Sequence, residues 1–163
     1  YDSFKDQIAL LGDYTDEQLK NSDINIKPRL RMSSVYYMAA LMSALTGKTY
    51  LVAGTSNKCE LFVGYFTKGG DSVHDIAPIA DLTVDEVIAV GEELKVPHEV
   101  LYRTPDDGLS NQSDEDKLGV KYKEIASYMA GEELPEEVKQ KIEKLHKNNL
   151  HKFNIPTYRK ETE

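Results

Sequence analysis

The chain has 163 residues, enough for one domain whose hydrophobic core folds without disulfide staples. Its 28 acidic residues outnumber its 20 lysines and arginines, giving a net charge of −8, which excludes a general binder of DNA or RNA. The single cysteine, Cys59, excludes an internal disulfide framework and favours a reducing compartment.

The first third of the chain is predicted to be helical. Residues 3–11 (SFKDQIALL) form a short helical pattern, and Thr15 with Gln18 has the spacing of a capping box that starts another helical turn. A separate long helix is expected to begin near Pro28, because proline suits a first helical turn, and to end at Gly47.

The second half of this long helix, Val35 to Leu45, is apolar on nearly all sides, so we expect it to be buried. It has about half of the roughly 20 residues that a membrane span needs. The chain also lacks the basic-then-apolar start of a secretory signal, although it begins at Tyr1 rather than Met and so represents a processed, cut or partial chain. We expect a cytoplasmic protein with no membrane partner.

The run TYLVAG, Thr49 to Gly54, predicts a strand that is buried on both faces, as in parallel sheets. A buried strand needs neighbours, because unpaired buried amides and carbonyls are costly. The only other candidate, near Val100, is too weak to complete a sheet. We therefore expect the neighbouring strands to come from upstream in the natural protein or from another copy of the chain.

The remaining elements are predicted from turn residues and helical periodicity. Thr83 and Glu86 form a capping box for a helix that runs to about Lys95, with Val87, Val90 and Leu94 as its inner face. The other expected segments are a helix over 57–64, a loop over 65–80, an acidic loop over 104–116, helices over 122–129 and 136–149, and a tail after residue 151.

Two clusters of polar residues surround the predicted strand. Arg29 and Arg31 lie in the first turn of the long helix, where backbone N–H groups and guanidinium donors favour an anion such as phosphate, with a pair of surface cations as an equal alternative. Ligands of open α/β sheets bind beyond the ends of strands, where this chain has GTSNKCE. There Thr55 offers a hydroxyl and Glu60 a carboxylate for a hard cation such as Mg²⁺, unless the segment is only a capped strand–turn–helix.

Two further clusters follow in the chain. In GYFTKGGD and the adjacent HD, the aromatic residues suit stacking on a flat ring, Lys68 suits a phosphate, and Asp75 suits a hydroxyl, or the segment is an ordinary charged turn. His151 and Lys152 form a basic patch that is more often simply solvated. Cys59 is interpreted as a small buried residue rather than a nucleophile.

Taken together, these motifs resemble the ammonia-dependent NAD synthetases of the N-type ATP pyrophosphatase family. The resemblance covers residues 25–152 and rests on NIKPRLRM, on GTSNKCELFVGYFTKGGD, on DIAPIADL and on the DGL…DE..LG..Y stretch, in the family's order. It implies that the nicotinate carboxylate of deamido-NAD attacks the α-phosphate of ATP and expels pyrophosphate, after which ammonia displaces AMP and yields NAD.

The resemblance also implies roles for individual residues. Thr55 corresponds to the ATP-contacting threonine and Glu60 to the Mg²⁺ carboxylate. The contacts to deamido-NAD correspond to the following residues: Arg29, Lys68, Asp75, His151 and Lys152. No residue is assigned to covalent chemistry. The family is homodimeric, with the dinucleotide at the subunit interface, and the apolar helix of residues 35–45 suits that role.

Three departures from the family pattern are present. The phosphate loop Ser-Gly-Gly-x-Asp-Ser is absent from the sequence, which agrees with the missing neighbours of the predicted strand. A lysine that many members carry is Val84 here, so that contact is lost or passes to another residue such as Lys58. A family Ser or Thr is replaced by Asp106, an acid that is unfavourable beside triphosphate.

The expected fold class is α/β: a helix-rich fragment that contributes part of a doubly wound, mostly parallel sheet of the adenine nucleotide alpha hydrolase-like type. Residues 1–152 are expected to be the C-terminal part of one NAD synthetase domain, inactive on its own, and 153–163 a mobile tail. The alternatives are another adenylating ATP pyrophosphatase and a non-catalytic dimerisation or ligand-binding fragment.

Overall fold

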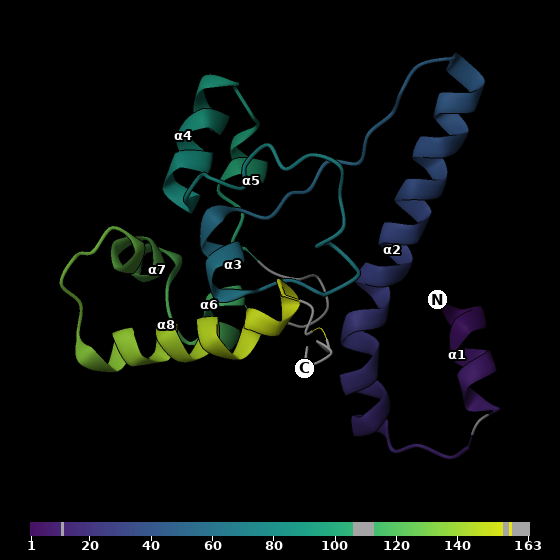
Figure 1. The fold of residues 1–163 in the computed structure, drawn as a ribbon, viewed down its shortest axis with the longest axis horizontal. Helices are drawn as coiled ribbons and strands as arrows, with labels where there is room; N and C mark the ends of the chain where they lie inside the picture. The colour runs from purple at the N-terminus through teal and green to yellow at the C-terminus, as the bar shows by residue number, and fades with distance from the viewer. Residues whose placement is uncertain (11, 106–112, 155–156, 158–163) are drawn as a thin grey trace, which may run out of the picture. The chain divides into compact units, whose positions relative to one another are not determined.

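The structure, a computed structural model, describes residues 1–10, 12–105, 113–154 and 157 (Figure 1). Within these residues the chain forms helices and an isolated β-bridge but no strand of a sheet. The helices are α1 (Asp2–Ala9), α2 (Asp16–Thr46), α3 (Lys58–Val63), α4 (Val84–Glu93), α5 (His98–Leu101), α6 (Asp114–Leu118), α7 (Tyr122–Met129) and α8 (Glu136–Asn149), followed by the 3-10 turn η1 (Leu150–Lys152).

The chain divides into two compact units, which we describe separately. Unit 1 comprises residues 1–56 and 66–78, and unit 2 comprises residues 57–65 and the described part of 79–163. None of the helices in the described ranges combines the length and the apolar character that a membrane crossing requires.

Unit 1 is dominated by α2, which is one helix and not the two that the sequence predicts. Its start is as predicted: Thr15 Oγ1 accepts from the N–H of Gln18 at 3.2 Å, and Gln18 Oε1 accepts from the N–H of Thr15 at 2.9 Å. Gly47 ends the helix with a left-handed φ of 68°. Pro28 lies inside the helix and removes one N–H, so the carbonyl of Ile24 loses its intrahelical donor. Ile24 is exposed, so water can satisfy that carbonyl and the helix continues.

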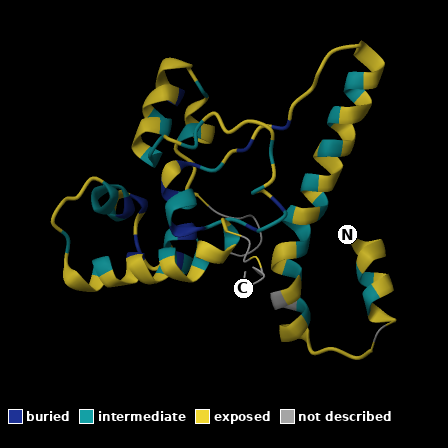
Figure 2. Cartoon of the chain, viewed as in Figure 1, coloured by how far each residue is buried: buried dark blue, intermediate teal, exposed yellow. Residues whose placement is uncertain are grey.

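The second half of α2 is largely exposed, so the prediction that it is buried is wrong for this chain (Figure 2). Met38 is 50% exposed and Leu45 is 70% exposed. A helix that is apolar all round needs partners on every side, and the described part of unit 1 covers only one side of this one. Apolar side chains of this half of the helix are therefore exposed among the described residues.

The segment Thr49–Gly54 is extended but does not form the predicted strand. Ala53 makes an isolated parallel bridge with Ile76, in which the N–H of Gly54 donates to the Ile76 carbonyl at 2.7 Å. Val52 is buried whereas Leu51 is 56% exposed, so the expectation of burial on both faces is wrong. Among the described residues, the backbone groups of Leu51 and Ala53 make no hydrogen bond, which leaves the edge away from Ile76 open.

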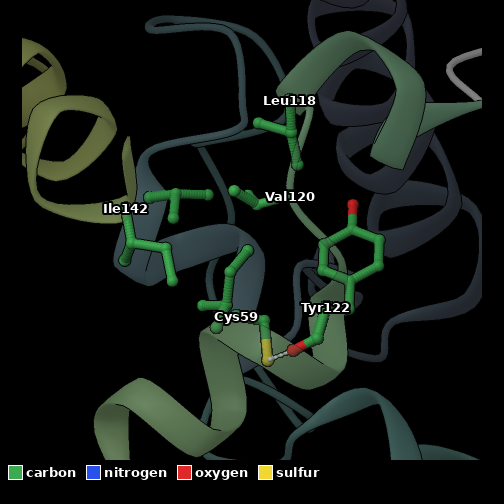
Figure 3. Packing of buried hydrophobic residues seen from close by; sticks show 7 residues of the cluster. Cys59, Leu118, Val120, Tyr122 and Ile142 are labelled. Carbon is green, nitrogen blue, oxygen red and sulfur yellow. Dashed lines mark hydrogen bonds between the residues drawn. The ribbon is translucent and has the colours of Figure 1, made fainter. Parts of the chain in front are cut away.

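Unit 2 packs α3 against α7 and α8. Its core contains Cys59 and Val63 from α3, Ile125 from α7 and Ile142 from α8, all fully buried (Figure 3). Helices over 122–129 and 136–149 are confirmed with the predicted bounds. The capping box of Thr83 and Glu86 is also confirmed, and α4 follows it.

Other predictions for unit 2 need correction. A helical turn, α5, stands where a weak strand or turn was expected near Val100. Val90 and Leu94 are exposed, so they do not form the predicted inner face of the helix. The buried residue of α4 is Gly91. Part of the acidic loop, residues 106–112, lies outside the described residues, as does most of the predicted tail over 153–163.

Candidate functional site

In unit 1, α2 holds the loop that follows residue 66. Arg29 Nε donates to the carbonyl of Lys68 at 3.2 Å, and Thr67 Oγ1 donates to Asn25 Oδ1 at 3.0 Å. Asn25 and Arg29 are four residues apart and so lie on one face of the helix. The fold therefore brings together two of the predicted dinucleotide contacts, Arg29 and Lys68.

The loop itself is shaped by short-range hydrogen bonds. The N–H of Thr67 donates to Asp71 Oδ1 at 3.0 Å, and the N–H of Gly69 donates to Ser72 Oγ at 3.1 Å. A Cβ on Gly70 would lie 3.0 Å from Cβ of Pro28, so the absence of a side chain allows the loop to approach α2 closely. The adjacent Gly69 has a different role, since it adopts a left-handed φ of 75°.

Asp75 lies beside the extended segment rather than standing free in solvent. Its Oδ2 accepts from the N–H of Val52 at 2.8 Å, and its Oδ1 accepts from the Tyr36 hydroxyl at 3.2 Å. Partial burial and the negative charge of Asp75 raise the pKa of Tyr36, so the phenol stays a donor. Thr55 directly follows Gly54, whose N–H donates to the Ile76 carbonyl, and Thr55 is exposed. Thr55 and Asp75 therefore lie at the same bridge.

In unit 2, Glu60 belongs to the capping box of α3. Its Oε2 accepts from the N–H of Asn57 at 2.8 Å, while Asn57 Oδ1 accepts from the N–H groups of Cys59 and Glu60 at 2.9 and 3.0 Å. The carboxylate is thus oriented toward the N-terminus of the helix. The carboxylate that the sequence offers as a metal ligand thus also serves a capping function.

The C-terminal end of α3 is capped by side chains of α8 and η1. His146 Nδ1 lies 2.7 Å from the carbonyl of Phe62, Asn149 Nδ2 donates to Val63 at 2.9 Å, and Lys152 Nζ donates to Gly64 at 2.6 Å. Three consecutive carbonyls at a helix end are therefore satisfied by side chains spaced three residues apart. Lys152 and Glu60 engage opposite ends of α3, so the fold does not bring these two predicted residues together.

His151 does not join this row. Its Nδ1 lies 2.9 Å from the carbonyl of Asn148, and the residue is exposed. The predicted basic pair therefore splits into a capping lysine and a surface histidine.

A buried carboxylate that the sequence did not single out, Asp114, lies at the start of α6. It is 5% exposed, and it accepts from the hydroxyl of Tyr65 at 2.9 Å and from that of Tyr122 at 3.4 Å. Burial, with the negative charges of Glu60 and Asp114, raises the pKa of Tyr122. The available signal was the run Ser113 to Asp116, whose capping-box spacing places an acid on the first helical position.

Two residues singled out from the sequence, Cys59 and Val84, belong to the packing of unit 2. Cys59 is confirmed as buried, and burial raises the pKa of its thiol, so a thiolate nucleophile is disfavoured. Val84 packs against the core of unit 2 rather than toward solvent. Asp106 lies outside the described residues.

No group of three or more carboxylate, histidine or cysteine side chains that could hold a metal is found in the described part of the chain. Mg²⁺ in nucleotide-binding sites is commonly held by one or two carboxylates, with substrate phosphates and water completing the shell. Glu60 would supply one such carboxylate to a bound Mg²⁺.

The chain matches the NAD synthase family over residues 3–156. It is 44% identical over 144 residues to the NH(3)-dependent NAD(+) synthetase of Alkaliphilus metalliredigens, covering 88% of this chain and 56% of the relative. A second relative of that name, from Mesoplasma florum, is 40% identical over 153 residues, covering 93% and 59%. The chain thus spans a little over half the length of these curated relatives.

Solved structures give a similar result. A structure named NMN synthetase, from Francisella tularensis, is 31% identical and has a TM-score of 0.82, covering 96% of this chain and 63% of its own. An NH3-dependent NAD synthetase from Campylobacter jejuni, solved with a nitrate ion, is 26% identical with a TM-score of 0.66, covering 98% and 63%.

Proposed function

Because this chain belongs to the NAD synthase family, we propose that its protein catalyses the ATP-dependent amidation of deamido-NAD by ammonia. A carboxylate oxygen of the nicotinate attacks the α-phosphorus of ATP, and the bond to pyrophosphate breaks. Ammonia then attacks the resulting acyl adenylate, AMP leaves with the carboxylate oxygen, and the amide of NAD forms. The enzyme is thus a carbon–nitrogen ligase that uses ATP as a co-substrate.

The observation that carries this proposal is the contact between Arg29 and the Lys68 loop. The Nε–O bond of 3.2 Å brings a guanidinium to the backbone of a second cationic residue, on a loop shaped by Gly69 and Gly70. Phosphate groups are bound well by cations and by guanidinium forks in particular. The pyrophosphate of a dinucleotide is a suitable anion for this arrangement.

On the ATP side, we assign Thr55 to a contact with the nucleotide and Glu60 to Mg²⁺. When bound, Mg²⁺ supplies positive charge that stabilises the phosphate oxygens. Glu60 would hold it with one carboxylate, already oriented by its capping bond to Asn57. Glu60→Gln in the natural-length protein should raise the KM for Mg²⁺-ATP, and unchanged kcat and KM for ATP would remove Glu60 from the metal site.

We assign His151 and Lys152 to contacts with the dinucleotide, although Lys152 also caps α3. The ammonium of Lys152 donates to the Gly64 carbonyl, and its positive charge would also attract a phosphate group. In this assignment the same side chain caps α3 and contacts the substrate.

We also propose a homodimer and a larger sheet. The exposed apolar side of α2, with Met38 and Leu45, suits an interface between two copies. The open edge at Leu51 and Ala53 suits a further strand in parallel order, which would make Thr49–Gly54 part of the doubly wound sheet. A reducing, cytoplasmic location agrees with one free, buried cysteine.

The proposal is tested with the natural-length protein, ATP, Mg²⁺, ammonia and deamido-NAD. The expected products are NAD, AMP and pyrophosphate in equal amounts, whereas ADP and phosphate, or no NAD, would contradict the proposal. A second candidate follows from the Francisella tularensis neighbour named NMN synthetase. A parallel assay with nicotinate mononucleotide separates the two, because the higher kcat/KM identifies the substrate. A parallel panel of other carboxylate and nucleotide substrates tests the wider class of adenylating enzymes.

A further inference from the structure

Asp75 is held by groups from two separate parts of unit 1. Its N–H donates to the Val52 carbonyl at 2.9 Å, and its Oδ2 accepts from the N–H of Val52 at 2.8 Å. Its Oδ1 accepts from the hydroxyl of Tyr36 on α2 at 3.2 Å. Both carboxylate oxygens are therefore engaged, one by the extended segment and one by the helix.

We infer that Tyr36 is a positioning residue for the substrate site: its hydroxyl fixes the Asp75 carboxylate and, through it, the extended segment that leads to Thr55. This inference rests on the proposed function, in which Asp75 contacts deamido-NAD. A hydrogen bond to a charged acceptor is stronger than one between neutral groups, so one hydroxyl is enough to orient the carboxylate.

The other contacts of the same helix face support this role. Besides Tyr36, three side chains of α2 reach the segments that carry the site: Asn25 contacts Thr67, Arg29 contacts the Lys68 carbonyl, and Ser43 accepts from the N–H of Tyr50 at 3.0 Å. Positions 25, 29, 36 and 43 are separated by four or seven residues, which places them on one stripe of the helix. Tyr36 is the member of this stripe that meets a carboxylate.

The neighbouring tyrosine provides a matched control. Tyr37 is 69% exposed and makes no hydrogen bond among the described residues. The substitutions Tyr36→Phe and Tyr37→Phe remove the same hydroxyl from adjacent positions and leave both aromatic rings in place. Any difference between the two variants therefore reports the contact with Asp75.

The kinetic test uses both variants in the natural-length protein. Tyr36→Phe should raise the KM for deamido-NAD about tenfold with kcat within about twofold, the pattern of lost substrate binding. Tyr37→Phe should change neither constant. Equal KM values in the two variants, or a loss confined to kcat, would overturn the inference.

A second measurement does not depend on activity. The Val52 N–H donates to Asp75, so its hydrogen exchange should accelerate about tenfold in Tyr36→Phe and stay unchanged in Tyr37→Phe. Unchanged exchange at Val52 would overturn the positioning role, whatever the KM shows. If the wild-type protein makes no NAD, the proposed function fails, and the positioning contact is then decided by exchange at Val52 alone.

Discussion

Arg29 and Arg31 lie two positions apart on α2 but differ in their hydrogen bonds. Arg29 donates through Nε to the Lys68 carbonyl at 3.2 Å, a bond that uses one of the five guanidinium N–H donors. Arg31 is exposed and makes no hydrogen bond among the residues that the structure describes. Substituting each arginine in turn therefore distinguishes the effect of a specific hydrogen bond from the effect of positive charge alone.

Arg29→Ala in the natural-length protein should raise the KM for deamido-NAD about 30-fold, the effect of losing about 2 kcal/mol of charge-assisted hydrogen bonding. Arg31→Ala should change the same KM by less than about twofold, because an exposed charge contributes little. Steady-state kinetics with each substrate varied in turn make the comparison. A change confined to ammonia, or equal effects of the two substitutions, would contradict the assignment of Arg29.

Residues that act within a contiguous motif could be predicted from the sequence, whereas residues that act through distant partners could not. The bond from the N–H of Asn57 to Glu60 spans three residues and follows from capping-box spacing. The bond from Tyr36 to Asp75 spans 39 residues and that from Tyr65 to Asp114 spans 49. No local rule pairs such side chains, because only the tertiary fold brings them together.

At the scale of elements, the junction of α3 and α8 depends on a glycine. Gly64 has a φ of 69°, and a Cβ there would lie 2.3 Å from Cβ of Asn149, the residue that caps the Val63 carbonyl. Gly131 has a similar φ of 77° but nothing within 4 Å of the corresponding position. An alanine at either position would strain the left-handed backbone, but only an alanine at Gly64 would also clash with Asn149.

Gly131→Ala should lower the free energy of unfolding by about 1 kcal/mol, the cost of a left-handed alanine. Gly64→Ala should cost at least about 2 kcal/mol more, because it also displaces Asn149 and uncaps the end of α3. Urea unfolding of the two variants measures the difference. Equal losses of stability would show that the α3–α8 contact does not constrain Gly64.

The exposed side of α2 can be tested as an interface between copies. Leu41→Glu places a charge among the exposed apolar residues of this helix and should convert the expected dimer into a monomer, since burying an unpaired charge is costly. Leu94→Glu on α4 is the matched control, because Leu94 is 72% exposed and lies in unit 2. Light scattering should show a monomer for the first variant alone. A dimer in both would place the interface elsewhere.

Helix ends could be predicted better than helix environments. The starts at Thr15 and Thr83 and the ends at Gly47 and Gly64 follow from capping rules that act within one turn. The break expected at Pro28 is absent because flanking helix on both sides outweighs one missing N–H. The exposure of residues 35–45 could not be predicted, since an apolar sequence pattern does not say which other elements pack against a helix.

At the scale of the whole molecule, the extended segment Thr49–Gly54 has one paired edge and one open edge among the described residues. It carries alternating burial, with Val52 inside and Leu51 outside, and it is paired on one edge by the bridge to Ile76. The sequence indicates an apolar strand here, but a sheet needs neighbours that the described residues do not supply. The chain also spans a little over half the length of the relatives that it matches.

We propose that residues 1–163 contribute one part of an amidating site and that further residues of the family's domain complete it. The direct measurement is NAD formation from ATP, Mg²⁺, ammonia and deamido-NAD by residues 1–163 alone, compared with the same residues joined to the part of the Alkaliphilus metalliredigens relative that the alignment leaves uncovered. The account predicts no turnover by residues 1–163 and NAD formation, with AMP released, by the joined protein. Turnover by residues 1–163 alone, or none by the joined protein, would contradict it.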